Sequence, residues 1–418
     1  MLKKIKDTFN EFPSKFWVLV AAMFVDRVGG TLIFPFFALY ITQKFNVGMT
    51  QAGVLLGIFS FSGLIGNLIG GGLADRFGRK VMVLFGLIFS ALSSVTMGLV
   101  DEMAVFYFLA VIVGLLSDIA GPAWQAMIAD ILPEDQRTEG FGIMRVVGNM
   151  AWIVGPIIGG FVATRSYLLL FILDAISSLI TAGIIYKFIP ETKPEPTISD
   201  FETAEADTLL DTFVGYGRVF KDGIFMAYIL VSMLMLLVYL QMYQTLGVYL
   251  RDTHGVSEQG YGFVLTSSAI TVIIFQFWVT RRVKKYPPML MMALGSAFYL
   301  VGFSMYGLVS IFALFIAAMV LITIGEMIVM PVSQALAANF APEDMRGRYM
   351  AIFSLAWAAP STFGATAAGI IMDNYNPNWV WYIAGMICTI AVLGFLWLHY
   401  ATRERFKELD IAKEASPA

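Results

Sequence analysis

Twelve long apolar stretches dominate the sequence, and they restrict the folds open to this chain more than any other feature. An α-helix needs about 20 apolar residues to cross roughly 30 Å of hydrocarbon, because each residue adds about 1.5 Å. Only 14% of the residues are charged, against about 25% in a typical soluble domain. The sequence therefore predicts an all-α membrane protein with twelve transmembrane helices, at residues 16–43, 50–73, 81–100, 104–131, 138–163, 167–189, 223–250, 258–280, 288–309, 311–339, 346–372 and 378–401.

The two halves of the chain match each other at one constant offset of 209 residues. At this offset the matched pairs include Tyr40 and Tyr249, Pro122 and Pro331, and Gly155 and Gly364. Parallel repeats of this kind form a substrate site near the membrane midplane, and the halves rock against each other to give alternating access. We expect two homologous six-helix bundles at 1–189 and 223–418, joined by a cytoplasmic linker at 190–222.

Lysine and arginine residues are distributed unevenly over the predicted loops. If both termini are cytoplasmic, 22 of the 27 basic residues lie on the cytoplasmic side, and only Lys44, Arg165 and Arg251 lie outside. Basic residues are preferentially retained in the cytoplasm. We therefore expect a monomeric, multi-pass protein of the cell inner (cytoplasmic) membrane with both termini in the cytoplasm.

Several classes of function are disfavoured by residue types that are scarce in the chain. The single cysteine is Cys388, and the two histidines, His254 and His399, lie far apart, which argues against a metal site. A net charge of −3 without a basic block argues against a nucleic-acid partner. No nucleotide-binding loop is visible either. We expect no cofactor and no enzymatic reaction, and we expect an ion gradient to supply the energy.

The predicted loop after the second apolar stretch carries a compact group of glycines and charges. We expect Gly71 to permit close helix approach and Gly78 to permit a tight turn, while Asp75 forms a conformational latch beside the cations Arg76 and Arg79. The string from Gly71 to Lys80 closely resembles the signature of the major facilitator superfamily. This resemblance implies the twelve-helix fold of that superfamily and a latch that controls alternating access.

The corresponding loop of the second half, at residues 280–285, keeps the basic residues but lacks the carboxylate and both glycines. We expect any latch there to be weaker.

A second motif lies in the fifth predicted span. It consists of glycines around one proline, and it resembles the antiporter signature of the superfamily's drug:proton exchangers, at Gly148, Gly155, Pro156, Gly159 and Gly160. Glycines let helices pack closely in lipid, and a proline among them bends the helix. The chain departs from that family in the fourth span, where Ala110 occupies the position of an arginine linked to proton transfer.

Charges predicted to lie inside the membrane are the candidates for proton coupling, because each costs at least about 2.5–3.5 kcal/mol at the bilayer centre. They are Asp26, Arg27, Asp118, Arg145 and Glu326, and we assign coupling to Asp26, Asp118, Arg145 and Glu326. The resemblance places the spans that carry the three carboxylates around the central cavity. Static roles remain open, with Asp26 paired to Arg145 or Arg27, and with Asp118 and Glu326 serving in helix packing.

A substrate surface is predicted from aromatic residues on the same spans, together with one carboxylate. Its members are Phe34, Tyr40, Trp124, Tyr239, Tyr243 and Glu326. Rings of this kind suit varied lipophilic ligands, and an acid can bind either a proton or an organic cation.

The resemblance and these residues together predict a proton-coupled secondary transporter that exports lipophilic small molecules, cations among them, in the manner of a multidrug exporter. Three alternatives remain open on the same fold. One is a flippase for glycolipids or lysolipids, another is a metabolite or sugar exporter, and the third is a transporter-like receptor without transport.

Overall fold

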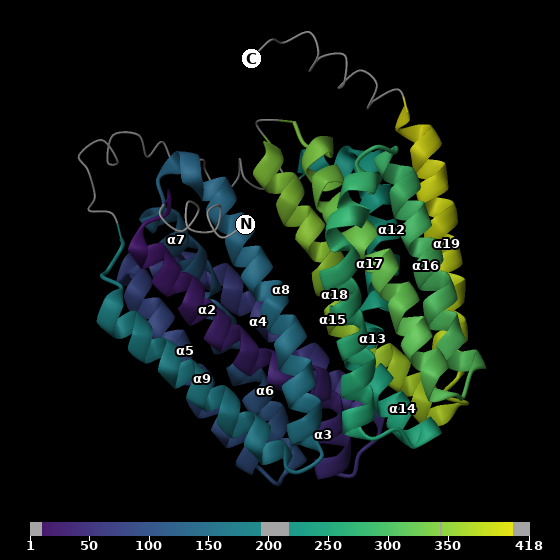
Figure 1. Ribbon diagram of the computed structural model, residues 1–418, viewed down its shortest axis with the longest axis horizontal. Helices are drawn as coiled ribbons and strands as arrows, with labels where there is room; N and C mark the ends of the chain where they lie inside the picture. The colour runs from purple at the N-terminus through teal and green to yellow at the C-terminus, as the bar shows by residue number, and fades with distance from the viewer. Residues whose placement is uncertain (1–10, 194–216, 343–344, 404–418) are drawn as a thin grey trace. The chain divides into compact units, whose positions relative to one another are not determined.

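The computed structural model describes residues 11–193, 217–342 and 345–403. Its regular elements in these ranges are helices (Figure 1). The prediction of twelve spans is confirmed, because 12 helical segments are long and apolar enough to cross a membrane. They are Ser14–Lys44, Met49–Phe77, Arg79–Leu99, Met103–Ile131, Glu139–Ala163, Tyr167–Phe188, Gly223–Gln244, Glu258–Val283, Pro288–Leu308, Phe312–Phe340, Arg348–Asn374 and Trp379–Ala401.

Contacts divide the chain into two compact units, of which the first comprises residues 1–202, 243–266 and 365–369. Within this unit α2 packs against α8 and α9, α5 packs against α9, and α4 packs against α6 (Figure 1). The helices of this unit are α2 (Ser14–Ile33), α3 (Phe37–Lys44), α4 (Met49–Phe77), α5 (Arg79–Leu99), α6 (Met103–Ser117), α7 (Gly121–Ile131), α8 (Arg137–Ala163), α9 (Tyr167–Phe188) and α14 (Leu246–His254), with the short turns η1 (Phe34–Phe36), η2 (Asp118–Ala120) and η3 (Glu134–Gln136).

The second unit comprises residues 203–242, 267–364 and 370–418. In it, α16 packs against α17 and α19, and α12 packs against α19. Its helices are α12 (Gly223–Tyr239), α16 (Pro288–Leu308), α17 (Phe312–Phe340) and α19 (Trp379–Ala401), while α13 (Gln241–Gln244), α15 (Glu258–Val283) and α18 (Arg346–Asn374) contribute to both units. The predicted division at 190–222 stays a prediction, and much of that linker and both chain ends lie outside the described residues.

Small residues decide how closely the helices of the first unit approach. A Cβ atom added at Gly66 would lie 2.0 Å from the carbonyl oxygen of Leu115, and one at Gly70 would lie 2.2 Å from that of Ile119. Added at Gly71, it would meet nothing within 4 Å. The expectation that Gly71 permits close approach is therefore wrong, because the face of α4 that touches its neighbours carries Gly66 and Gly70.

Two spans of the first unit change helix type part-way along. In span one, α2 gives way to η1, which contains Pro35, before α3 continues. In span four, α6 gives way to η2 at Asp118, and α7 begins at Gly121. Interrupted spans are where transporters commonly place binding and coupling groups, because backbone polar groups are released there. The second interruption places the Asp118 carboxyl at a helix break.

Candidate functional site

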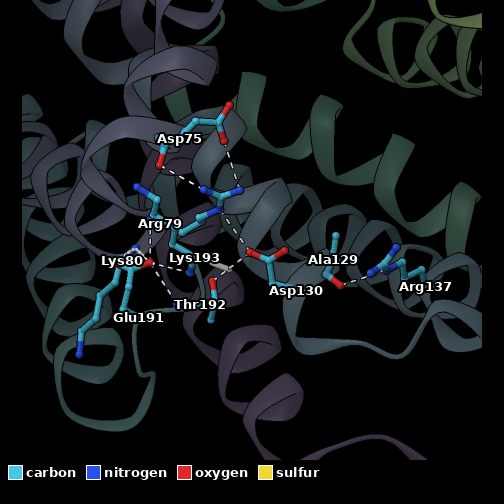
Figure 2. A network of polar contacts seen from close by, with 10 residues as sticks. Asp75, Arg79, Lys80, Ala129, Asp130, Arg137, Glu191, Thr192 and Lys193 are labelled. Atoms are coloured by element: carbon cyan, nitrogen blue, oxygen red, sulfur yellow. Dashed lines mark hydrogen bonds and ion pairs between the residues drawn. The ribbon is translucent and has the colours of Figure 1, made fainter. Parts of the chain in front are cut away.

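The loop between α4 and α5 is the centre of a polar network, which we call the α4–α5 network and which comprises Asp75, Arg79, Asp130, Glu191, Thr192 and Lys193 (Figure 2). Arg79 is its hub. The arginine Nη2 lies 3.2 Å from Asp75 Oδ1, and its Nε lies 3.3 Å from Asp130 Oδ2. The Arg79 side chain is 13% exposed and that of Asp130 is 22% exposed, whereas that of Asp75 is 74% exposed. Water therefore screens the Asp75 contact far more than the Asp130 contact.

Glu191, just beyond the end of α9, binds the first turn of α5. Its Oε1 accepts hydrogen bonds from the backbone nitrogens of Arg79 at 2.8 Å and Lys80 at 3.3 Å. The same oxygen accepts from Thr192 N and Lys193 N, both at 3.0 Å. Burial opposes ionisation of this carboxyl, but the four backbone donors together hold its pKa below the usual range. A carboxylate is also favoured here by the partial positive charge of a helix N-terminus.

Gly78 permits this arrangement for two reasons. Its φ of 101° lies in a region that other residues rarely adopt, which lets α4 end and α5 begin within one residue. A Cβ atom at this position would also lie 2.5 Å from Glu191 Oε2. A side chain at position 78 would therefore disturb both the turn and the carboxylate that caps α5.

Further bonds draw other helix ends into the α4–α5 network (Figure 2). Thr192 Oγ1 donates to Asp130 Oδ2 at 3.3 Å, near the end of α7. Lys193 Nζ donates to the carbonyl oxygen of Arg76 at 3.2 Å, near the end of α4. Sequence reasoning named Arg76 as a cation of the latch, but here its backbone oxygen supplies the bond. The network therefore joins the ends of α4, α7 and α9 to the start of α5.

A second set of polar side chains lies inside the first unit, on α2, α5 and α9. Ser178 Oγ donates to Asp26 Oδ1 at 3.3 Å. Ser94 Oγ donates to Asp174 Oδ2, and the Asp174 residue is only 6% exposed. The sequence-based set of intramembrane charges was wrong in leaving out Asp174. It lies inside the predicted span at 167–189, so the rule that selected the other acids also selects it.

The remaining charged candidates of the first unit lie on α2, η2 and α8. The Arg27 guanidinium interacts electrostatically with the carboxyls of Asp26 and Asp118. A Cβ atom at Gly63 would lie 2.3 Å from Asp118 Oδ2, so this carboxyl lies against α4. Arg145 is exposed on α8. Ala110 is fully buried in α6, at the position where an arginine was the family expectation.

The aromatic candidates of the first unit fall into two environments. Phe34 and Tyr243 belong to one cluster with Trp152, where the ring centroid of Trp152 lies 5.6 Å from that of Phe34 and 5.0 Å from that of Tyr243. Tyr40 is 3% exposed, and its hydroxyl donates to Met97 O at 2.8 Å. Trp124 packs against the apolar core. Tyr40 is thus a packed interior residue, whereas Phe34, at 43% exposure, offers a ring to a ligand.

In the second unit, two predicted substrate residues meet directly. The hydroxyl of Tyr239 on α12 donates to Glu326 Oε1 on α17 at 2.9 Å. Two more rings adjoin Tyr239: Tyr299 stacks with a centroid distance of 5.8 Å, and Trp357 is edge-on at 6.2 Å. Glu326 is half-buried. A carboxylate bonded to a tyrosine of an aromatic cluster is the chemistry that binds organic cations.

The glycines of the fifth span lie where α8 meets its neighbours. A Cβ atom at Gly155 would lie 2.0 Å from Thr31 Oγ1, and one at Gly159 would lie 2.6 Å from Leu32 O. At Gly160 it would lie 3.0 Å from Gly262 Cα, whereas at Gly148 it would meet nothing within 4 Å. Pro156 lies inside the helix between these contacts. Three of the four motif glycines are thus at close helix contacts.

Comparison with known sequences assigns the chain to a family. The family model described as Major Facilitator Superfamily matches residues 19–257 and 245–416. The chain belongs to the major facilitator superfamily. Transporters of this superfamily are among its relatives: a "Na(+), Li(+), K(+)/H(+) antiporter" of Planococcus maritimus is 27% identical over 90% of this chain and 93% of the relative. "Multidrug resistance protein MdtH" of Escherichia coli is 23% identical over 95% of this chain and 97% of the relative.

Solved structures share the superfamily fold. A nucleoside transporter, NupG, superposes with a TM-score of 0.76 at 12% identity, covering 92% of this chain and 99% of that one. A peptide transporter POT superposes with a TM-score of 0.75 at 17% identity, covering 94% and 95%. The protein is therefore a multi-pass membrane transporter of the major facilitator fold.

Proposed function

We propose that this transporter is a proton-coupled antiporter that exports lipophilic organic cations from the cytoplasm by alternating access. The observation that carries the proposal is the Glu326 carboxyl, hydrogen-bonded to Tyr239, whose own ring adjoins those of Tyr299 and Trp357. A carboxyl in this setting can hold either a proton or a cation, but not both. That competition is sufficient for exchange of one for the other.

The first unit supplies the other proposed coupling groups. We assign proton transfer to Asp26, Asp118 and Arg145, as expected from the sequence, and we add Asp174. The bonds from Ser178 to Asp26 and from Ser94 to Asp174 support this assignment, because each carboxyl keeps a hydroxyl partner in both of its protonation states. Within the first unit, we assign Phe34 and Tyr243 to substrate binding, because their rings form an aromatic cluster with Trp152.

The α4–α5 network serves in this proposal as the conformational latch. Its ion pairs and backbone bonds hold four chain segments in one arrangement, and a transport cycle must release some of them. Both termini are proposed to be cytoplasmic, in the inner membrane of the cell, with the latch on the same side. We further propose that the monomer is the functional unit.

Exchange of alkali cations for protons is a second candidate function. The relative named as a Na(+), Li(+), K(+)/H(+) antiporter favours it, as do the oxygen atoms that Asp26, Asp174, Ser94 and Ser178 present within the first unit. Oxygen ligands suit hard cations. The two candidates thus differ in the carboxyls that bind the transported cation: Glu326 for organic cations, and Asp26 with Asp174 for alkali cations.

Binding of radiolabelled tetraphenylphosphonium to the purified transporter tests the proposal. Glu326→Gln should weaken binding about tenfold or more, because it removes the charge that opposes the cation. Tyr239→Phe should weaken it less. Tyr306→Phe is a matched control, since this buried tyrosine of the same unit donates to Phe315 O instead.

Unchanged tetraphenylphosphonium affinity in Glu326→Gln would contradict the assignment of the substrate site. Loss of lithium-driven proton flux in Asp174→Asn, with no tetraphenylphosphonium binding by the wild type, would favour the second candidate.

A further inference from the structure

An apolar groove of about 310 Å³ runs along the first unit, between α8 and the first part of α15. Its walls carry Ile157, Ile158 and Phe161 from α8, and Gly262, Phe263 and Thr266 from α15. All of these residues belong to the first unit. Ile157, Phe161 and Phe263 are 42%, 50% and 54% exposed, so on a membrane span they face the hydrocarbon of the bilayer.

The groove follows from the glycine contact beside it. Gly160 and Gly262 bring the two backbones together, since a Cβ atom at Gly262 would lie 3.1 Å from Gly160 Cα. The large side chains on either side of this contact cannot interdigitate as closely as the two glycines approach. A channel lined by methyl groups and rings is left open along the helices, and a flexible acyl chain can fill it.

A cation lies at the end of this groove. Arg165 follows the last residue of α8 by two positions, and its Cζ lies 4.7 Å from the centroid of the Phe161 ring, which is part of the groove wall. In the part of the chain that the structure describes, no carboxylate lies within 4 Å of this guanidinium. Glu258, in the first turn of α15, accepts hydrogen bonds from Gln43 at 3.1 Å and Tyr167 at 3.2 Å. Arg165 is therefore available to an outside anion.

We propose that the groove binds one anionic phospholipid, with an acyl chain along Ile158 and Phe263 and the phosphate on Arg165. Helix ends lie at the level of lipid phosphates, because the hydrocarbon is about as thick as a span is long. The planar guanidinium fork matches a phosphate with two parallel hydrogen bonds, and each buried methylene of the chain adds affinity. The site is separate from the proposed exchange of protons for cations and does not depend on it.

Thermal unfolding of the full-length transporter in detergent, titrated with dioleoyl phosphatidylglycerol, tests this site. Because a ligand that binds only the folded state raises the unfolding temperature, the wild type should be stabilised in a saturable manner. Arg165→Ala should weaken the apparent affinity about tenfold, since it removes charge-assisted bonds to the phosphate. Arg165→Lys should lie between the two, because it keeps the charge without the fork.

Arg281→Ala is the matched control, because the Arg281 Cζ also lies over a phenylalanine ring, that of Phe277, at 4.1 Å, but outside the groove. It should titrate like the wild type. Gly262→Leu should weaken lipid binding by filling the groove; if it fails to fold, Thr266→Leu replaces it.

Native mass spectrometry should show one retained phosphatidylglycerol in the wild type and Arg281→Ala, and none in Arg165→Ala. Equal affinities in the wild type and Arg165→Ala would overturn the site. So would stabilisation by inorganic phosphate alone, which would mark a simple anion site without a role for the groove, and so would an equal loss in Arg281→Ala, which would mark general surface charge.

Discussion

Each half of the chain has a loop after its second span. The charged residues at these two loops have different contacts. In the first half, Arg79 is bound by Asp75 and Asp130, and Glu191 caps the next helix. In the second half, Arg281 lies over Phe277 with its Cζ 4.1 Å from the ring centroid, and Arg282 lies over Trp278 at 5.4 Å. Carboxylates from distant segments bind the first loop, whereas the two arginines of the second half contact rings of their own helix, α15.

The difference arises from three substitutions between the repeats. At the offset of 209 residues, Lys284 occupies the place of Asp75, Pro288 that of Arg79 and Asn339 that of Asp130. An exposed cation over a ring contributes only about 0.5–1 kcal/mol, whereas a shielded charge that loses its partner costs about 1.5–3 kcal/mol. We therefore expect the first loop to favour one conformation more strongly than the second loop does.

Removing the hub of the α4–α5 network should have the largest effect. Arg79→Ala leaves Asp130 without its cation, and we expect the rate of transport to fall about tenfold or more, since about 1.4 kcal/mol corresponds to a factor of ten. Arg282→Ala, in the last turn of α15, should change the rate less than about twofold. Uptake into proteoliposomes at equal protein density measures both. Equal losses of transport rate in the two variants would contradict the expected difference between the two halves.

Within the α4–α5 network, the two carboxylates that pair with Arg79 should differ. Asp130→Asn should slow transport severalfold, because this side chain is 22% exposed and holds both Arg79 and Thr192. Asp75→Asn should have a smaller effect, because its side chain is 74% exposed and its ion pair is screened. Rates measured at low and high salt check this, with the Asp75 effect disappearing first. A larger loss in Asp75→Asn would show that Asp75 acts in a conformation other than this one.

Substitutions of two neighbouring glycines on α4, Gly70 and Gly71, should change the unfolding temperature differently. Gly70→Ala should lower the unfolding temperature by several degrees, because its methyl group would overlap Ile119 O. Gly71→Ala should leave stability unchanged or raise it slightly, because the methyl group meets nothing within 4 Å and alanine is the better helix former. Thermal unfolding in one detergent compares them. The reverse order would place the contact face of α4 at Gly71.

The smallest expected effect is a pH dependence of the unfolding temperature. The Glu191 pKa is lowered in the folded protein, so its stabilising contribution is complete above the unfolded value of about 4.3 and is lost as the pH falls through the folded value. The unfolding temperatures of wild type and Glu191→Gln should therefore differ at pH 7 and converge at lower pH. Glu134→Gln is the control, because that carboxylate is 88% exposed and lies 3.7 Å from Arg137. A difference that stays constant as the pH is lowered, over the whole range in which both proteins fold, would mean that charge on Glu191 is irrelevant.

Much of the fold could be predicted because the bilayer sets the length of each span, and the predicted boundaries mostly agree with the structure within a few residues. The α4–α5 network could be predicted only in part. Asp75 and Arg79 are close in sequence, but Asp130 and Glu191 come from distant segments that only the packed helices bring together. Tyr40 shows the same limit, since the sequence does not reveal whether a ring on a span meets a ligand or a neighbouring helix.

The central claim, that a proton and an organic cation compete for Glu326, is tested most directly by proton release. Tetraphenylphosphonium is added to the detergent-purified wild type in weakly buffered solution, and a pH-sensitive dye records the protons set free. We expect saturable proton release that is absent in Glu326→Gln and preserved in Tyr306→Phe. Binding of tetraphenylphosphonium without any proton release, or equal release from Glu326→Gln, would contradict it.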